Sequence, residues 1–235
     1  RLQGDWSSDV CSSDLSSAWA ERQLVQRLHD ALLNTPAALA YVTEKRGWQL
    51  STIKAARLGF MPQDKRLLLA DLNLSDNWRT VIQKFPPTMI IYIHTQQGRL
   101  TYLSGRSIEG KKHYNPPRDI IGERQPYYNH LYSPQAEQVV IVEGQADAIT
   151  FGEWGIAAVA IGGMQAADEL LNRLKAHPRL FVALDNTDDA RAKCRSLALT
   201  LKGETYLPTL PGDVKDVNEW LQRGASTEDA LMLLN

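Results

Sequence analysis

The stretch QVVIVEGQADAITFGEWGIAAVAIGG, residues 138–163, decides the fold class. It opens with four apolar β-branched residues at positions 139–142, which predict a strand buried on both faces, as in a parallel sheet. Residues 146–154 have helical composition, and residues 156–161 form a second apolar run before a Gly-Gly turn. A strand, a helix and a second strand in direct succession predict an α/β fold with a parallel sheet.

Acidic residues follow three predicted strands. Glu143 closes the first strand, Asp185 closes the apolar run 180–184, and Asp216 lies in the turn after a short strand at 204–207. Open α/β sheets place their ligands at the carboxyl ends of the strands, and crowded carboxylates repel one another unless a cation lies among them. Oxygen ligands of this kind suit Mg²⁺, with Mn²⁺ as an alternative.

The case for a functional role differs between these acids. A buried and unpaired Glu143 would be costly, which favours a functional role over that of a helix cap. Asp147 lies in the first turn of the predicted helix, where a carboxylate is favourable to the helix dipole whatever its function. Asp147 is therefore the weaker candidate.

Three motifs carry a resemblance to a known family. They are Glu-Gly-x-x-Asp-Ala at 143–148, Leu-Asp at 184–185 and KDVNEWL at 215–221. Together they resemble the TOPRIM fold that DnaG-type primases, topoisomerases and certain nucleases share. Upstream, residues 97–106 and 112–115 resemble the basic subdomain of bacterial and phage primases, and residues 40–60 resemble the helical part of that core. The similarity covers about residues 19–234, and the primase branch fits best.

The sequence departs from the family's Asp-x-Asp motif, because Thr187 stands where the second Asp belongs. Either Thr187 is a substitution, or one residue has been inserted and Asp188 takes the role. We favour Asp188, whose carboxylate is then expected to point toward Asp185 and Glu143.

The resemblance implies a DNA-dependent RNA polymerase: a primase fragment that makes short RNA primers on single-stranded DNA with Mg²⁺. The implied partners are the template, ribonucleoside triphosphates and a replicative helicase. The implied catalytic residues are Glu143, Asp185 and Asp216, with Glu143 holding metal or accepting a proton. The implied metal ligands are Glu143, Asp185, Asp188 and Asp216. The implied nucleotide and template contacts are Arg99, Arg106, Lys112, Tyr114 and Asn115.

Charge is divided unevenly along the chain, although the net charge is only −1. Residues 99–124 hold six basic and three acidic residues with aromatic residues among them, whereas residues 138–235 hold nine basic and fourteen acidic residues. Cations beside aromatic rings suit single-stranded nucleic acid. The alternative is a solvated hairpin face, and the family resemblance favours nucleic-acid binding.

Four regions are expected along the chain. Residues 5–15 correspond to an in-frame translation of a common sequencing-library adaptor, so residues 1–15 are predicted to be non-native and disordered. Residues 16–87 are predicted to form the helical part of the core, 88–135 a basic β-rich subdomain and 136–235 the TOPRIM domain. Without Cys11, Cys194 stands alone, which excludes a disulfide or a zinc site built from this chain.

Two rival functions remain open from the sequence. One is a TOPRIM nuclease with the same acids, and the other is a non-catalytic module that binds single-stranded nucleic acid. P-loop and dinucleotide-binding enzymes are disfavoured because neither glycine motif is present. The sequence holds no long apolar run, so we expect no membrane span and a cytoplasmic protein.

Overall fold

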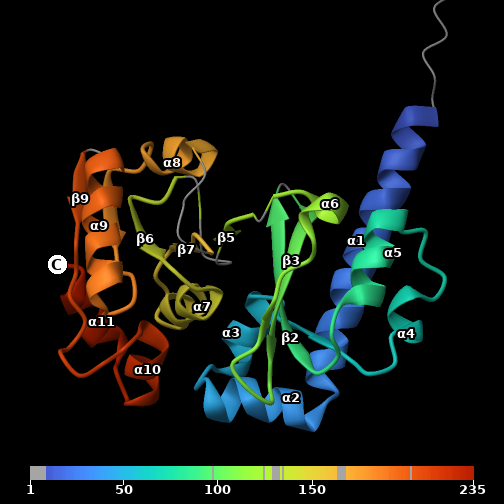
Figure 1. The fold of residues 1–235 in the computed structure, drawn as a ribbon, viewed down its shortest axis with the longest axis horizontal. Helices are drawn as coiled ribbons and strands as arrows, with labels where there is room; N and C mark the ends of the chain where they lie inside the picture. Colours follow the sequence, from blue (N-terminus) through green and yellow to red (C-terminus); the bar gives the residue numbers. More distant parts are fainter. Residues whose placement is uncertain are drawn as a thin grey trace, which may run out of the picture. The chain divides into compact units, whose positions relative to one another are not determined.

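A computed structural model of the chain describes residues 9–96, 98–123, 125–128, 133, 135–162, 168–201 and 203–235. The chain forms two compact units, the first from Arg1–Thr35 with Arg57–Glu123 and the second from Pro36–Ala56 with Arg124–Asn235 (Figure 1). This division differs from the predicted boundaries. The segment 36–56 belongs with the C-terminal unit and not with the helices that flank it in sequence.

The first unit is built on a four-stranded antiparallel sheet in the order β1-β2-β3-β4. Its strands are β1 (Gly59–Met61), β2 (Met89–Gln96), β3 (Arg99–Ser107) and β4 (His113–Tyr114). Its helices are α1 (Asp9–Leu33), α4 (Arg66–Leu69), α5 (Asp76–Lys84) and α6 (Arg118–Ile121). The β2–β3 pair is the hairpin that the sequence predicts, with longer strands than expected.

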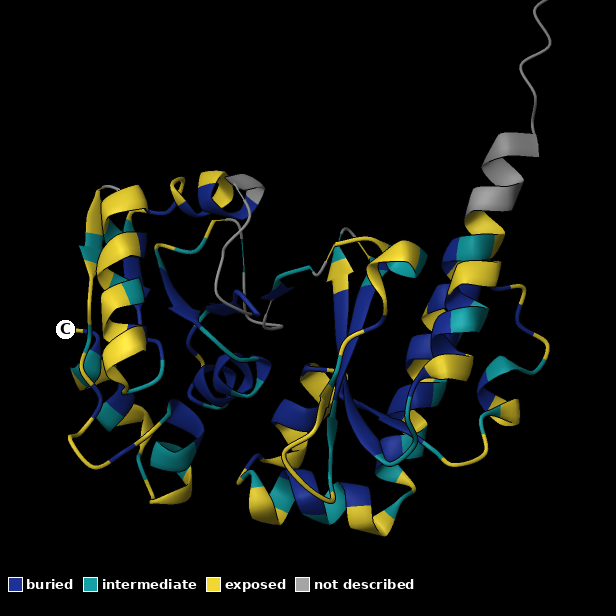
Figure 2. Ribbon diagram, in the orientation of Figure 1, coloured by how far each residue is buried: buried dark blue, intermediate teal, exposed yellow. Residues whose placement is uncertain are grey.

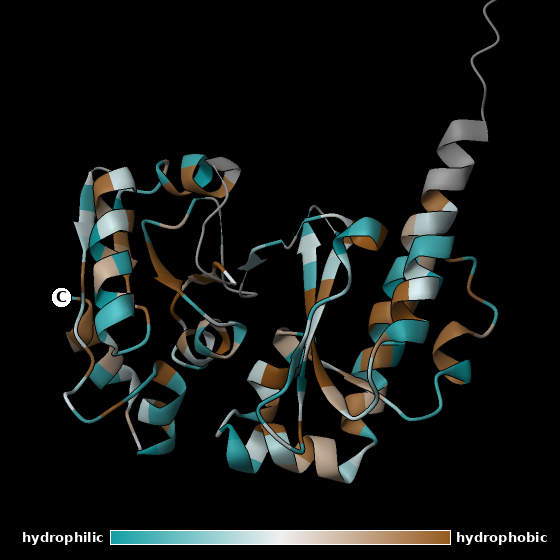
Figure 3. Cartoon of the chain, in the orientation of Figure 1, coloured by the Kyte–Doolittle hydropathy of each residue, from teal (hydrophilic) through white to brown (hydrophobic). Residues whose placement is uncertain are grey.

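Helix α1 packs its apolar side on this sheet. Leu24, Leu28 and Leu32 recur at helical spacing and are fully buried. A Cβ at Gly59 of β1 would lie 2.9 Å from the Cβ of Leu28, so glycine allows the close approach of strand and helix. Figure 3 shows hydrophobic and hydrophilic residues alternating around α1. The helix begins at Asp9, so residues 9–15 are helical and not disordered as predicted; an established helix extends readily by one hydrogen bond per residue.

The second unit is built on a five-stranded sheet in the order β5-β7-β6-β8-β9. Only β5 is antiparallel to its neighbour, which confirms the predicted α/β fold with a parallel sheet. The strands are β5 (Tyr127–Tyr128), β6 (Gln138–Val142), β7 (Ala158–Ala160), β8 (Arg179–Val182) and β9 (Glu204–Tyr206). The helical elements are α2 (Pro36–Ala40), the π-helix Tyr41–Lys45, α3 (Leu50–Ala55), α7 (Gln145–Glu153), α8 (Asp168–Leu174), α9 (Asp188–Leu201), α10 (Val217–Gln222) and α11 (Thr227–Leu233).

The core of this unit explains the long apolar strands. Side chains of β6, β7 and β8 join α8 and α9 in one buried cluster that includes Val139, Ile141 and Val182. Helix α7 contacts β5, β6 and β7, and nearly all of it is buried, whereas much of α9 is exposed (Figure 2). Both faces of β6 are therefore covered, as its uninterrupted apolar sequence predicts.

In the described residues, no helix is long and apolar enough to cross a membrane.

Candidate active site

The strand order places two acids side by side. From β6 the chain passes to β7 on one side and then returns to β8 on the other, so the order reverses between β6 and β8. Ligands of open α/β sheets bind at such a reversal, beyond the carboxyl ends of the strands. Glu143 directly follows β6, and Asp185 follows β8 after two buried residues. The structure thus brings these two predicted residues to the expected edge.

The third predicted acid, Asp216, is joined to Asp185 by a backbone clamp. Asn186 donates its backbone N–H to the Lys215 carbonyl at 2.8 Å and its side-chain amide to the Val214 carbonyl at 3.0 Å. Asp216 in turn caps α10 by accepting from the Glu219 N–H at 2.8 Å. Because both loops are fixed in this way, the part-buried carboxyls of Asp185 and Asp216 face a common cation, the Lys215 ammonium.

The charges in this group act on one another. Burial raises the pKa of the Asp185 carboxyl; the Lys215 charge opposes this rise, and the charges of Glu143 and Asp216 add to it. We call Glu143, Asp147, Asp185 and Asp216 the acidic group, because Asp147 belongs to the same electrostatic set.

Asp147 is the residue that sequence reasoning undervalued. It lies in the first turn of α7 with only 8% of its surface exposed. Burial and the charges of Asp216 and Asp185 raise its pKa to about 7, although the Asn218 backbone N–H and the Arg46 charge oppose the rise. Its Oδ2 would lie 3.0 Å from a Cβ at Gly144, so glycine leaves room for this carboxylate. The Glu-Gly-x-x-Asp motif at residues 143–147 was the sequence feature that could have identified Asp147 as a site residue.

The composition of the acidic group fits a divalent cation. Four carboxylates are offset by few positive charges, namely Lys215 and Lys193 near Asp185 and Arg46 near Asp147. All candidate ligand atoms are hard carboxylate oxygens, the type that Mg²⁺ prefers. Among the described residues, however, no three acidic, histidine or cysteine side chains converge tightly enough to form a complete metal site.

The structure does not bring Asp188 into the acidic group, which corrects the insertion hypothesis. Its side chain is 97% exposed and pairs with the Arg191 guanidinium at 2.8 Å. Helix α9 already begins at Asp188, and the exposed Thr187 uses its hydroxyl to accept from the Ala190 N–H at 3.2 Å. Thr187 thus caps the helix directly. These contacts favour the other alternative, in which Thr187 is a substitution at the second position of the motif.

Sequence reasoning also did not predict a buried polar network around Asn218, which is close to Asp147. The Asn218 amide, 1% exposed, accepts from Arg46 Nη1 at 2.9 Å and from Gln222 Nε2 at 2.8 Å. It donates to the Arg46 carbonyl at 3.0 Å and to Thr150 Oγ1 at 3.1 Å. All four hydrogen-bonding positions of this amide are thus used. The network attaches the segment 36–56 to α7 and α10, and places the Arg46 charge near Asp147.

The predicted nucleotide and template contacts all lie in the first unit, and they divide into two kinds. Lys112 and Asn115 are exposed, and Arg106 on β3 donates to His113 Nε2 on β4 at 2.6 Å. Two others have structural contacts instead. Arg99 pairs with the buried Glu21 at 2.9 Å and 3.0 Å. Tyr114 packs on the core, with its ring 4.6 Å from that of Phe85 in an edge arrangement.

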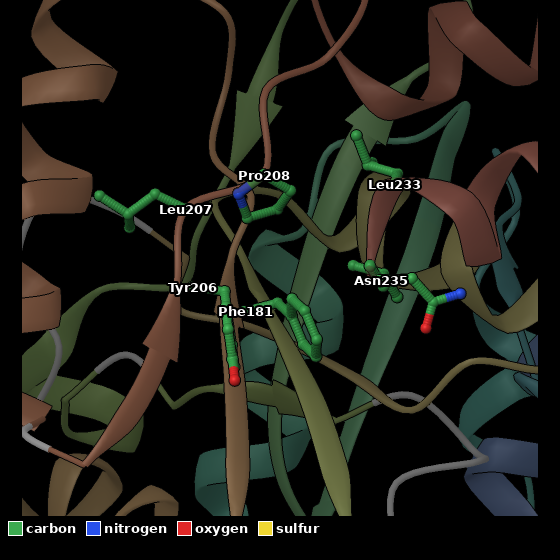
Figure 4. Close-up of a pocket in the computed structure, with 7 residues that line it drawn as sticks. Phe181, Tyr206, Leu207, Pro208, Leu233 and Asn235 are labelled. Carbon is green, nitrogen blue, oxygen red and sulfur yellow. The ribbon is translucent and has the colours of Figure 1, made fainter.

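A separate apolar pocket of about 190 Å³ lies beside β9 (Figure 4). Its lining includes Phe181 and Tyr206, whose rings stack 5.2 Å apart, and the chain end at Asn235. It contains no member of the acidic group, so the pocket and the candidate site are distinct.

Comparisons with known proteins agree with this geometry. A family model described as Toprim-like matches residues 140–221. A DNA primase from Synechococcus elongatus is 29% identical over 223 residues, which cover 80% of this chain and 32% of that protein. The chain therefore spans about a third of the length of this curated relative.

Solved structures extend the likeness to the whole chain. The Aquifex aeolicus primase, with its zinc-binding and RNA polymerase domains, has a TM-score of 0.77 at 20% identity, covering 100% of this chain and 63% of that one. A DnaG primase catalytic domain bound to single-stranded DNA has a TM-score of 0.75 at 18% identity, covering 95% and 79%. The E. coli primase catalytic core has a TM-score of 0.73 at 20% identity, covering 92% and 79%. These findings confirm the predicted resemblance and fold class.

Proposed function

Because the chain has the fold of a DnaG-type primase catalytic core with a Toprim-like domain, we propose that it is a primase fragment that synthesises short RNA on single-stranded DNA. One observation carries the proposal. The acidic group lies at the reversal of strand order. Burial and the neighbouring negative charges raise the pKa values of its members Asp147 and Asp185, so these carboxylates are held together at an energetic cost. Groups held at such a cost are characteristic of functional sites.

The acidic group would hold Mg²⁺ or Mn²⁺ through Glu143, Asp147, Asp185 and Asp216. A bound divalent cation supplies neutralisation of the charge that develops on the phosphates. In the reaction, a primer 3′-hydroxyl oxygen attacks the α-phosphorus of a nucleoside triphosphate, and the bond to pyrophosphate breaks. In this proposal Glu143, which directly follows β6, holds the cation or accepts the hydroxyl proton.

In this proposal the template is bound by basic residues of the first unit, of which Lys112 is exposed and Arg106 is half-buried. Arg106 and Lys112 supply charge for phosphates, and Asn115 supplies an exposed amide beside them. Arg99 and Tyr114 support this surface indirectly, Arg99 through Glu21 and Tyr114 through the core. A replicative helicase is a proposed partner of the whole protein, of which this chain resembles a part.

The proposal is tested by incubating the protein with single-stranded DNA, the four ribonucleotides and Mg²⁺. Short RNA that appears only when template and Mg²⁺ are both present is the expected result. Cut DNA without RNA would identify a nuclease, and retained DNA with neither product would identify a binding module. EDTA provides the control, because it removes the divalent cation and leaves the basic surface unchanged.

A non-catalytic binding module is the second candidate, and the loop after β8 favours it. Thr187 is neutral, and its hydroxyl caps α9. Asp188 forms an ion pair with Arg191. This loop therefore offers one carboxylate, Asp185, where the family motif has two. The primase proposal requires Asp147 to supply the missing charge from α7.

A further inference from the structure

Lys215 lies within ion-pair distance of two members of the acidic group. Its ammonium nitrogen lies 3.5 Å from Asp216 Oδ2 and 3.8 Å from Asp185 Oδ2. Both distances are longer than the 2.7–2.9 Å or so of a charge-assisted hydrogen bond. The ammonium is therefore attracted by both carboxylates and is tightly bonded to neither.

The backbone of Lys215 is fixed, whereas its side chain is free to change position. The backbone N–H donates to Glu219 Oε2 at 2.9 Å, and the carbonyl accepts from Asn186 at 2.8 Å. The side chain is 66% exposed. Arg223, a few residues on, provides the contrast: its guanidinium bonds both Asp213 and Glu219. A flexible lysine on a clamped backbone can exchange partners without disturbing the fold.

Stability does not account for this placement. The Lys215 side chain is 66% exposed and its ammonium lies 3.5 Å or more from each part-buried carboxylate, and an ion pair with such a solvated partner contributes little, typically about 0–1 kcal/mol. The ammonium instead lies beside the carboxylates that the proposed function assigns to a divalent cation. Two cations within a few ångströms repel each other, so a divalent ion bound to these oxygens would weaken the attraction of the carboxylates for the ammonium.

We propose that Lys215 is an exchangeable counter-cation of the acidic group. It neutralises Asp185 and Asp216 while no divalent cation is bound. When a divalent cation takes these carboxylates, the ammonium is displaced and pairs with a phosphate of the incoming nucleoside triphosphate. Lysine suits this task because its ammonium is a compact charge on a flexible stem and binds phosphate as a point charge. This inference rests on the proposed function of the acidic group.

The test compares the parent with Lys215→Met, which keeps the length of the side chain and removes its charge. Mn²⁺ binding is measured by electron paramagnetic resonance without nucleotide. Binding of a non-hydrolysable ATP analogue is measured at saturating Mn²⁺. Loss of the competing ammonium should tighten Mn²⁺ binding by about three- to tenfold, and loss of the phosphate partner should weaken analogue binding by a similar factor. The two effects have opposite signs.

Two controls make the result specific. Lys175→Met removes the same charge from an exposed lysine after α8, and should change neither affinity. Lys215→Arg keeps the charge and should leave Mn²⁺ binding near the parent value. Unchanged or weaker Mn²⁺ binding in Lys215→Met would overturn the inference while leaving the metal site in place. A parent protein that binds no Mn²⁺ would overturn the proposed metal site, and the inference with it.

Discussion

The acidic group of the second unit and the basic strand surface of the first are held in different ways. The acids are partly or fully buried, and burial together with the charges of their neighbours raises the pKa values of Asp147 and Asp185. The basic surface residues Lys112 and Asn115 are exposed, and the half-buried Arg106 contacts His113 on the neighbouring strand. Burying like charges is costly, whereas exposing cations is not. The acidic group is therefore strong support for a functional site. The basic surface alone does not indicate a function, and its assignment to template binding depends on the similarity of the fold to primase cores.

The largest effect should come from the acid at the tip of β6. Glu143→Gln removes one charge from the acidic group without changing its volume. We expect nucleotide incorporation to fall by more than about 100-fold, because electrostatic stabilisation supplies most of the catalysis in phosphoryl transfer. Single-stranded DNA binding, measured by fluorescence anisotropy, should remain near the parent value.

Glu228→Gln is the matched control, since Glu228 is an exposed acid in the first turn of α11. It should leave incorporation unchanged. If Glu143→Gln incorporates nucleotides at close to the parent rate, Glu143 does not belong to the reacting centre.

The second effect concerns stability and pH. The pKa of Asp147 is about 7 in the folded chain against an ordinary value of 3.8, so the folded state holds a proton that the unfolded state releases. The stability contributed by the protonated form is present at low pH and is lost as the pH rises from about 4 to 7. One pKa unit corresponds to about 1.4 kcal/mol, so the total is on the order of a few kcal/mol.

Asp147→Asn should remove much of the loss of stability at rising pH, because a neutral amide has no proton to release. The free energy of unfolding is measured by urea unfolding at pH 5 and at pH 8, in EDTA. The parent should be less stable at pH 8 than at pH 5, and the variant should show a smaller difference between the two pH values. Adding Mg²⁺ at pH 8 should restore stability to the parent alone. Equal pH dependence in both proteins would mean that Asp147 is not buried among charges.

The sequence predicted the parts of this site that have a local signal. Glu143 and Asp185 were predicted because each acid follows an apolar run of the sequence. Asp147 was undervalued because its place in a helix turn already explains a carboxylate locally. Arg99 was assigned to nucleic acid from the family resemblance, and its ion pair with Glu21, 78 residues away, was not predicted. The Arg46–Asn218 hydrogen bond spans 172 residues and was not predicted either. Contacts of that range depend on the packing of the fold and leave no periodicity in the sequence.

The basic surface should give a smaller and more graded effect. Replacing Arg106 and Lys112 by Ala should weaken single-stranded DNA binding and reduce the logarithmic salt slope by roughly 0.7 for each lost phosphate contact. Lys84→Ala with Arg66→Ala removes two exposed cations from the same unit and should leave the slope unchanged. A double variant with the parent's slope would show that Arg106 and Lys112 face solvent during binding.

The smallest effect is expected at Asp188. This acid lies only three residues from Asp185 but outside the acidic group, so a variant at Asp188 tests directly whether the acidic group has been defined correctly. Its carboxylate is exposed and pairs with Arg191 across one turn of α9, an arrangement worth only about 0.3–0.5 kcal/mol. Asp188→Ala should therefore change nucleotide incorporation by less than about twofold and stability by less than about 0.5 kcal/mol, whereas Asp185→Asn should lower incorporation strongly, although by no more than Glu143→Gln does. The two variants are compared in the same primer-synthesis assay and by urea unfolding. A large loss of incorporation in Asp188→Ala with unchanged stability would mean that the loop after β8 rearranges in the active enzyme. In that case α9 would unwind by at least its first residue, Thr187 would give up its cap, and Asp188 would join Asp185 as the second acid of the motif.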